Sequence, residues 1–360
     1  MALSWVSVNA NDGSVIADLP TLRVDGSLKR TIGRYETQTA QLPLDKIPAN
    51  WKQATRKKAV FLVALDEGDD VVLGRPVWGG MVIVRTTSDK EAVGLSLVTA
   101  EDCLNDHFVG NEKFTGVPQN TIVRSLVEKY MTGYPIRVVE LPGANPARDR
   151  TYLDQDDKTL FSVLEELSGV VGGPEWCIDW EWVGSSLGMV LYVGARIGSA
   201  KPEGLGAAAQ FYLPGNLASA ELTEGYRRGE GANDVMATSS GAGNARPQSP
   251  RQVAVNDLRP RVEFRWSPSS NVVNVPTLTG HAQRALADMR DGTVELALTA
   301  NRAEGPKLGK DWNLGDDIGF DLTSWAWPDG ITGTARVVSI EMTDTTITPV
   351  LDVAGIEGID

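Results

Sequence analysis

The alternation of apolar and polar residues predicts antiparallel strands in the first third of the chain. Strand-like segments cover residues 59–66, 77–86 and 91–100. In the last of these, Val93, Leu95 and Leu97 share one face because side chains alternate along a strand. Polar, glycine-bearing stretches separate the segments, as between neighbouring antiparallel strands. We expect residues 1–107 to form a small β-barrel or sandwich.

A helical period appears in residues 108–198. The segment 121–131 carries an apolar stripe that ends before Gly133, and a second stripe runs from Leu160 to Leu167. Asp156 and Asp157 are expected at the start of the second helix, where acidic residues favour the positive helix end. Segments 134–141, 175–182 and 188–195 are rich in β-branched and aromatic residues and read as strands. This region is predicted to be an α+β domain.

The remaining residues, 199–360, return to strand patterns. Strands are predicted at 262–266, 293–299, 317–323, 334–342 and 345–353, and a helix from Thr277 to Met289. The segment 225–256 is rich in Gly, Ser, Pro and Asn and is predicted to be a loop. We expect a second β domain with a helical insertion at about residues 250–300. The fold class is therefore β-rich α+β.

Composition narrows the classes of function. The chain has 360 residues, which favours two to three domains. Its 34 basic and 47 acidic residues give a net charge of -13, which argues against a protein whose main task is to neutralise phosphates. No apolar run approaches the ~20 residues that span a bilayer, and the N-terminus lacks the pattern of a secretory signal. We expect synthesis and folding in the cytoplasm.

No metal, cofactor or catalytic residue is assigned. The two cysteines, Cys103 and Cys177, are expected to be buried reduced thiols, and His107 and His281 share no metal-ligand spacing with them. His107 reads as a strand-end residue and His281 as an early helical residue. The acidic pairs at 69–70, 156–157 and 316–317 match no calcium-binding loop. They read as turn or helix-start residues.

The segment GGPEWCIDWEW, residues 172–182, leaves three interpretations open. A strand would place Trp176, Ile178, Trp180 and Trp182 on one face and Glu175, Cys177, Asp179 and Glu181 on the other. Asp179 and Glu181, about 7 Å apart, suit a glycoside hydrolase. The tryptophans suit a glycan-binding module. The favoured interpretation is packing of the aromatic face on the helix that follows Asp157, with the acids solvated.

One dense basic cluster stands in the sequence. It comprises Lys52, Arg56, Lys57 and Lys58 beside Trp51, a pattern typical of a nucleic-acid stacking patch, a solvated hairpin or the rim of a subunit contact. Four positive charges are few against a net of -13. We treat the cluster, with Asp316 and Asp317, as candidate interface or channel residues.

Five segments together resemble a known family. They are PVWGG (76–80), DDKTLFSVLEELSGVVGGPEW (156–176), GANDVMA (231–237), KDWNLGDDIGFDL (310–322) and RVVSIEMTDTTITPVLDV (336–353). Their order is similar to the tail-hub family of siphophages, specifically the minor tail proteins of phages that infect Actinobacteria. The resemblance implies two tail-tube-like β-barrel domains with α/β domains inserted or appended. It implies a non-enzymatic structural protein of the virion tail tip, a homotrimeric ring that adapts a sixfold tube to threefold components.

The resemblance also implies partners. These are the distal tail protein, the tail tube, the tape measure protein and a central fibre or other minor tail proteins. Genomic DNA would pass through the ring without specific binding, because an acidic lumen repels phosphates. Many hubs continue into a fibre or lytic domain where this sequence stops after IEGID, so we expect separate proteins to supply those parts. A glycan-binding module and a glycoside hydrolase remain the alternatives to a hub.

Overall fold

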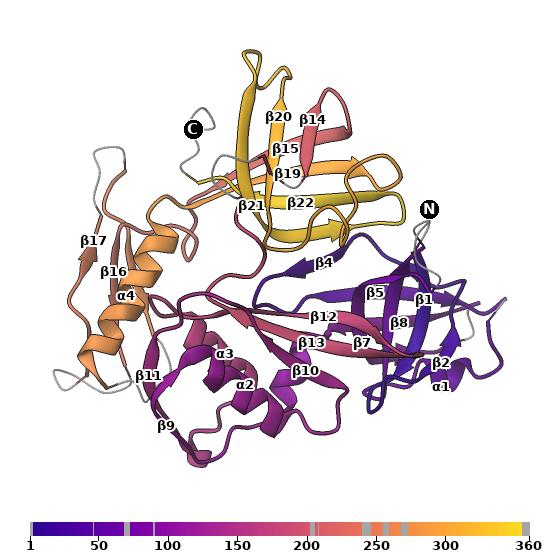
Figure 1. Cartoon of the computed structure of the whole chain (residues 1–360), viewed down its shortest axis with the longest axis horizontal. Coiled ribbons are helices and arrows are strands. Elements are labelled where there is room, and N and C mark those ends of the chain that lie inside the picture. The colour runs from indigo at the N-terminus through magenta and orange to yellow at the C-terminus, as the bar shows by residue number, and fades with distance from the viewer. Residues whose placement is uncertain are drawn as a thin grey trace.

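The computed structural model describes residues 3–45, 47–67, 73–88, 91–201, 206–207, 209–239, 246–254, 259–267 and 273–354. Two seven-stranded sheets, an α+β unit and a small inserted unit make up the molecule (Figure 1). Strand residues outnumber helical residues in every unit except the inserted one. The predicted β-rich α+β fold class is confirmed.

The first sheet, called here the N-terminal sheet, is antiparallel and has the order β2-β1-β6-β7-β8-β5-β3. Its strands are β1 (Leu3–Asn9), β2 (Val15–Asp18), β3 (Arg23–Val24), β5 (Thr37–Pro43), β6 (Val60–Asp66), β7 (Arg75–Thr86) and β8 (Ala92–Thr99). The short helix α1 (Trp51–Ala54) precedes β6. The three strands predicted from the alternation pattern are confirmed as β6, β7 and β8.

One strand leaves this sheet. β4 (Leu28–Thr31) pairs with β21 of the other large sheet, Leu28 opposite Met342 and Thr31 opposite Ser339. Four residues are too few to show the two-residue period of a strand, so no pattern in the sequence indicates that β4 pairs with the other sheet. The pairing joins β4, near the N-terminal end of the chain, to β21, near the C-terminal end.

The α+β unit fills the centre of the chain. Its sheet has the order β10-β13-β12, from β10 (Ile136–Glu140), β12 (Glu175–Val183) and β13 (Ser186–Gly194), and β9 (Glu112–Pro118) pairs with β11 (Ala147–Tyr152). Helices α2 (Gln119–Tyr130) and α3 (Leu160–Ser168) and the 3-10 segments Ala100–Asp106 and Asp154–Asp156 complete it. The predicted helices and strands of this region are confirmed.

The start of α3 differs from the expectation. Asp157 has a left-handed backbone, with φ 48°, and lies outside the helix. The cap is Thr159, whose hydroxyl accepts a hydrogen bond from the Ser162 N–H at 3.2 Å. The prediction that Asp156 and Asp157 open this helix is wrong, because a threonine closer to the helix satisfies the free N–H groups.

The second large sheet, called the C-terminal sheet, has the order β14-β20-β21-β22-β19-β15, with β4 added on β21. Its strands are β14 (Gln210–Leu213), β15 (Leu217–Gly225), β19 (Thr293–Asn301), β20 (Asp317–Leu322), β21 (Ile331–Met342) and β22 (Thr346–Asp352). The four predicted strands after residue 292 are confirmed.

The inserted unit, residues 226–292, lies between β15 and β19. It packs α4 (Val275–Met289) on a three-stranded sheet of β16 (Asp234–Ala237), β17 (Gln252–Val253) and β18 (Glu263–Trp266). α4 begins before Thr277 because Asn274 caps it and Pro276 occupies the first turn. The loop predicted for 225–256 is wrong at β16 and β17, and its residues 240–245 and 255–256 lie outside the described residues. The domain boundaries at His107 and Gly198 stay a prediction.

Two large hydrophobic cores meet along β12. Trp176 and Ile178 point into the core shared by the α+β unit and the outer face of the N-terminal sheet, whereas Cys177 between them belongs to the core that spans both large sheets. The strand therefore has apolar neighbours on both faces. This position makes β12 the central connection of the molecule (Figure 1).

Candidate functional site

The junction of β4, β7 and β12 is organised by one buried arginine. Arg30 of β4 donates to the carbonyl oxygens of Val77, at 3.3 Å, and Ile178, at 3.2 Å. Its guanidinium lies 3.3 Å from the Asp179 carboxylate, and its side chain is 11% exposed. A buried charge is tolerated when it is paired and hydrogen-bonded. Through these contacts Arg30 joins β4, β7 and β12.

A second ion pair links β12 to the C-terminal sheet. Arg336 of β21 binds both oxygens of Glu175, and Glu175 Oε2 also accepts from the Ile197 N–H at 2.8 Å. Burial acts to raise the pKa of Glu175, but the hydrogen bonds from Arg336 and Ile197 outweigh it and the pKa is lowered. The pair stays ionised near neutrality and fixes the α+β unit against the C-terminal sheet.

Glu101 is a buried carboxyl group that the sequence analysis missed. It is 7% exposed and accepts from the Ile178 N–H at 3.2 Å. Burial raises its pKa, while a hydrogen bond from Thr99 and the nearby Arg30 charge oppose the rise. No local pattern marks this glutamate, because its partner on β12, Ile178, is 77 residues away along the chain. It belongs to the same junction as Arg30.

The aromatic face of residues 172–182 is packed, as the favoured interpretation holds. Trp176 meets Phe161 of α3 with ring centroids 5.7 Å apart, and Trp180 meets Phe61 of β6 at 5.0 Å. Trp182 is partly buried and donates from Nε1 to the Gly74 carbonyl at 2.8 Å. These rings cannot stack on a glycan without unfolding, so the stripe is not a glycan-binding surface.

The acids on the opposite face are held by arginines, which corrects the expectation that they are merely solvated. Asp179 pairs with Arg30, and Glu181 makes a bidentate contact with Arg137 at 2.5 and 2.7 Å. Hydrogen bonding from Arg137 lowers the pKa of Glu181. A glycosidase needs one carboxyl group with a raised pKa to act as acid. The lowered pKa of Glu181 does not suit that role, and the Asp179 carboxylate is paired with the buried Arg30.

Both cysteines are free and buried, as expected. Burial raises the pKa of Cys103 to about 12 and that of Cys177 to about 12. Thiols with such pKa values carry almost no thiolate near neutrality, and the thiolate is the nucleophile. They act as small apolar core residues.

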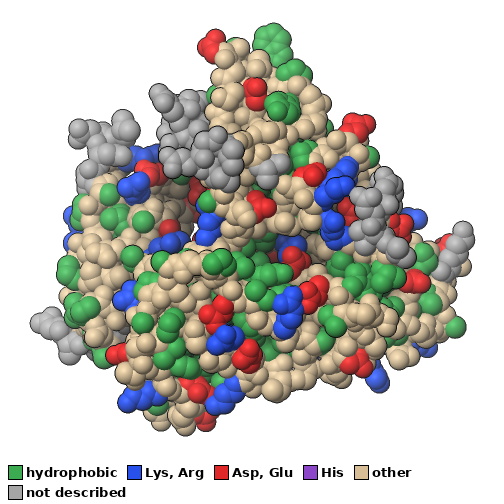
Figure 2. Space-filling model, in the orientation of Figure 1, with side chains coloured by type: hydrophobic (Ala, Val, Ile, Leu, Met, Phe, Trp, Pro, Cys, Tyr) green, Lys and Arg blue, Asp and Glu red, His purple; other side chains and the backbone are tan. Residues whose placement is uncertain are grey.

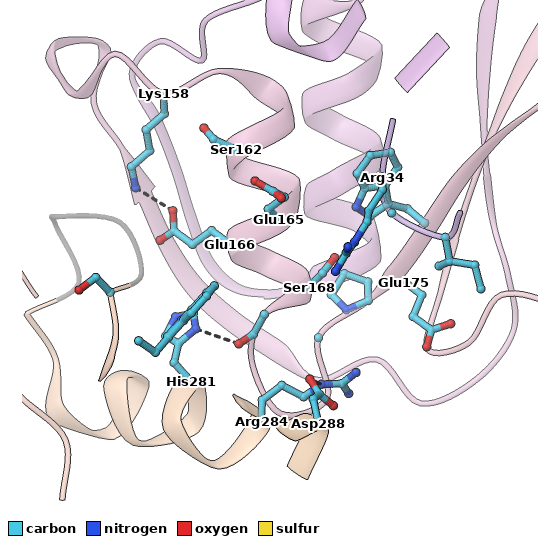
Figure 3. Close-up of a pocket in the computed structure, with 18 residues that line it drawn as sticks. Arg34, Lys158, Ser162, Glu165, Glu166, Ser168, Glu175, His281, Arg284 and Asp288 are labelled. Carbon is cyan, nitrogen blue, oxygen red and sulfur yellow. Dashed lines mark hydrogen bonds and ion pairs between the residues drawn. The ribbon is translucent and has the colours of Figure 1, made fainter. Parts of the chain in front are cut away.

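A cavity of about 540 Å³ lies between α3 and α4, where the α+β unit meets the inserted unit. Figure 3 shows Ser162, Glu165 and Glu166 on one side and His281, Arg284 and Asp288 on the other. Lys158 and Glu166 form an ion pair of 2.8 Å with side chains 10% and 11% exposed, and Arg284 pairs with Asp288. The lining holds acids and bases in similar number and most of them are already paired. A lining of paired acids and bases does not indicate which class of ligand the cavity would bind.

The two histidines have structural positions. His281 is in the first half of α4, as predicted, and donates from Nδ1 to the Gly169 carbonyl at 2.9 Å. Burial lowers its pKa despite that hydrogen bond. His107 follows a 3-10 segment rather than a strand, so the strand-end reading is wrong, and it stacks edge-on with Tyr134 at 5.8 Å.

The basic cluster near α1 is only partly free. Lys58 pairs with Asp106 at 2.6 Å, while Lys52, Arg56 and Lys57 are exposed. Lys52 and Arg85 both lie over the Trp51 ring, 5.7 and 5.8 Å from its centroid. The Trp51 ring therefore already has cations of the same chain over it. Exposed cations at this edge include Lys52, Arg56 and Lys57.

Asp316 and Asp317 hold the segment that enters the C-terminal sheet. Asp316 accepts from the N–H groups of Ser199 and Asn313, at 2.6 and 2.7 Å, and Asp317 from that of Lys201 at 2.8 Å and from Arg196. The role of Asp316 and Asp317 as interface or channel residues stays a prediction. The pair at 69–70 lies outside the described residues.

Within the residues that the structure describes, no group of three or more His, Cys, Asp or Glu side chains is arranged to hold a metal ion. In the same part of the chain, no helix is long and apolar enough to cross a bilayer.

One aromatic side chain stands out on the surface. Trp325, between β20 and β21, has a relative exposure of 103%, although Trp327 two residues later packs partly on the main core. Tyr212 of the adjacent edge strand β14 is also exposed, at 44%. Exposed aromatic rings on a rigid edge are typical of protein contacts.

Comparison with known proteins places the fold. No family model matches the chain, and no curated protein matches its sequence. The tail protein from Neisseria meningitidis MC58 superposes with a TM-score of 0.59 at 13% identity, over 99% of this chain and 97% of that one. The 43 kDa tail protein of prophage MuSo2 from Shewanella oneidensis gives 0.57 at 12% identity, over 97% and 98%.

A chain of the half-lidded Francisella PdpA–VgrG complex gives a TM-score of 0.53 at 8% identity, over 99% of this chain and 58% of that one. The similarity to the two tail proteins runs over the whole length of both partners. The chain therefore has the fold of phage tail proteins, as the resemblance in sequence implied.

Proposed function

We propose that the chain is a structural protein of a phage tail, where three copies form a hub ring at the tail tip. The observation that carries this proposal is the full-length match to two tail proteins, which includes both large sheets and the units between them. The junction residues support it, because Arg30, Glu175 and Arg336 stabilise the chain instead of presenting reactive groups. A structural role without catalysis fits this use of charge.

The two seven-stranded sheets give the ring its geometry. Three chains with two such sheets each would place six sheet units around an axis, which matches a sixfold tube to threefold components. The β4–β21 pairing and the Glu175–Arg336 pair hold the two sheets in one orientation. A rigid chain of this kind suits a closed ring, since each copy must present its surfaces at a constant angle.

The proposal includes partners and a channel. The distal tail protein, tail tube, tape measure protein and a central fibre or other minor tail proteins would contact the ring in the virion, after assembly in the host cytoplasm. Trp325 and Tyr212 supply an aromatic edge suited to such a contact. The net charge of -13 would let genomic DNA pass through the ring without binding. Further interface or channel candidates are Trp51, Lys52, Arg56, Lys57, Lys58, Asp316 and Asp317.

Mass photometry of the purified chain, followed by negative-stain imaging, tests the proposal. We expect a threefold ring with an axial opening wide enough for duplex DNA. A chain that stays monomeric, even when mixed with its neighbouring tail proteins, or that closes with another symmetry, contradicts the trimeric hub.

A further inference from the structure

The inserted unit differs from the rest of the chain in charge. Residues 226–292 contain nine arginines, no lysine and six acidic residues, so the unit is positive while the chain as a whole has a net charge of -13. Arginine presents a planar fork of donors that binds carboxylates in bidentate fashion, which lysine does not do. A run of arginines without lysine therefore indicates recognition of anionic groups with defined geometry.

Three of these arginines lie on one face of the small sheet. The other face is covered by α4, whose Leu278 and Ala282 pack on Val235 and Ala237. The free face carries Arg251, Arg261 and Arg265, with side chains 35%, 51% and 43% exposed. Together these three residues are called the arginine face. Figure 2 shows basic side chains over this unit, on the left of the view.

The guanidinium groups of this face are held in position. Asp234, with its side chain 1% exposed, binds both Arg251, at 2.6 Å, and Arg261. Glu263 binds Arg265 at 3.3 Å and Arg261 at 3.1 Å. The two acids do not neutralise three arginines, and all three arginine side chains remain partly exposed. Side chains fixed before binding lose less entropy when a partner arrives.

A complementary surface exists on the C-terminal sheet. Pairing of β15, β19, β22 and β21 places Thr223, Glu295, Asp352 and Arg336 in one row across the strands, and the Arg336 charge is paired with Glu175. Glu221 lies two residues from Thr223 on the same face. Glu221, Glu295 and Asp352 are all exposed. They are called the acidic face. In the described part of the chain, no ion pair joins an arginine of the inserted unit to this face.

We propose that the arginine face of one copy docks on the acidic face of the C-terminal sheet of a second copy. The contact is heterologous, because two different surfaces of the same chain meet, and contacts of this kind build rings or filaments. The inference rests on the proposed function to the extent that a tail protein works in several copies. It adds the surfaces and the type of residue that join them.

Charge reversal tests the pairing. Arg251→Glu with Arg265→Glu leaves Arg261 on Asp234, and Glu221→Lys with Glu295→Lys reverses the other face. Each double variant brings like charges together, so the association constant measured by analytical ultracentrifugation should fall about tenfold or more. The chain that carries all four changes has complementary charges again and should recover most of the association.

Two controls separate this effect from misfolding and from general charge. Arg23→Glu with Lys113→Glu changes the net charge equally at two other exposed positions and should leave association within about twofold. Arg251→Lys with Arg265→Lys keeps the charge and the fold but removes the forks, and should weaken association by several-fold. Thermal unfolding followed by circular dichroism checks that each variant is folded.

The outcomes are distinct. Recovery in the fourfold variant supports the contact. Association of the natural chain that neither double variant weakens overturns it, while a threefold ring seen by imaging would still support the hub. A natural chain that never self-associates also overturns it. Binding of a fluorescent DNA duplex that Arg251→Glu with Arg265→Glu abolishes, with self-association unchanged, would assign the arginine face to nucleic acid and overturn it as well.

Discussion

The two large sheets have equal strand numbers but different surroundings. The N-terminal sheet is buried on both faces, since Val60 and Leu62 point into one core while Phe61 and Val63 point into another. The C-terminal sheet is buried on one face, and along β19 the buried Val294 and Leu296 alternate with the exposed Glu295. The first sheet is covered on both faces, whereas the second has exposed side chains on one face.

The cause of this difference is the α+β unit. Its strand β12 and helices α2 and α3 cover the outer face of the N-terminal sheet, with Trp180 against Phe61. The unit inserted into the C-terminal sheet instead stands to one side, joined through residues next to Gly225 and Thr293 (Figure 1). The α+β unit completes a core with the N-terminal sheet, whereas the inserted unit extends the surface of the molecule.

Truncation on the two outer faces should have the most unequal results. Phe61→Ala removes a fully buried ring and should lower the free energy of unfolding by about 3–5 kcal/mol. Glu295→Ala, at the corresponding face of the other sheet, should change it by no more than about 0.5 kcal/mol. Urea unfolding followed by circular dichroism measures both. Similar losses for the two variants would refute the contrast.

One carboxylate, that of Glu175, contributes an ion pair to the link between the two halves. Glu175→Gln should lower the free energy of unfolding at pH 7 by about 2 kcal/mol, because the Arg336 charge loses its partner. The pKa of Glu175 is lowered in the folded state, so its contribution is complete above the ordinary value of 4.5 and is lost as the pH falls further. Unfolding measured at pH 7 and at pH 3.5 should show the difference between natural chain and variant shrinking. A difference that grows in acid would contradict the assignment.

The contact between β7 and β12 leaves no room for a side chain at Gly79. A Cβ atom there would lie 2.4 Å from the Trp180 ring, so Gly79→Ala should cost about 1–3 kcal/mol of unfolding free energy. Gly94 is the matched position in β8, where a Cβ atom would meet Thr86 at an ordinary 3.7 Å. Gly94→Ala should leave the free energy of unfolding almost unchanged. Thermal unfolding followed by circular dichroism measures both variants. Equal costs at both positions would mean that the β7–β12 packing is not as described.

Substitution at the free edge of the C-terminal sheet should have the smallest effect on the free energy of unfolding. Trp325→Ala removes a ring with no buried area, so the free energy of unfolding should stay within about 0.5 kcal/mol. Trp312, with 1% exposure, serves as the control, and its change to alanine should cost about 3–5 kcal/mol. Calorimetry checks both. A large loss for Trp325→Ala would show that this ring belongs to the core.

Much of the fold was predictable from sequence. The strands β8, β19 and β21 and the helices α2 and α4 follow periods that one buried face imposes locally. The strands β6 and β7 instead contain apolar runs that are buried on both faces. The packing of the tryptophans in residues 172–182 was also predictable, since a large apolar face needs a partner. The start of α3 was misplaced because three candidate caps, Asp156, Asp157 and Thr159, lie within four residues and only the backbone distinguishes them.

The residues of the junction were not predictable. Arg30, Glu101 and Arg336 occur in unremarkable local patterns, and each acquires its role from partners 77 to 161 residues away along the chain. The same holds for β4, whose four residues form a strand because β21 offers a free edge. The arginine-only composition of residues 226–292 is visible in the sequence, but the sheet decides which arginines share a face.

The sequence by itself determined most of the long strands and helices and the burial of the thiols and of the tryptophans in residues 172–182, because these depend on periodicity and on the free energy of removing apolar surface from water. The tertiary structure alone decided which charges meet, which sheet keeps an open face and how β4 joins the two halves. Those features depend on distances between segments far apart in the chain, and a one-dimensional pattern contains no such distances.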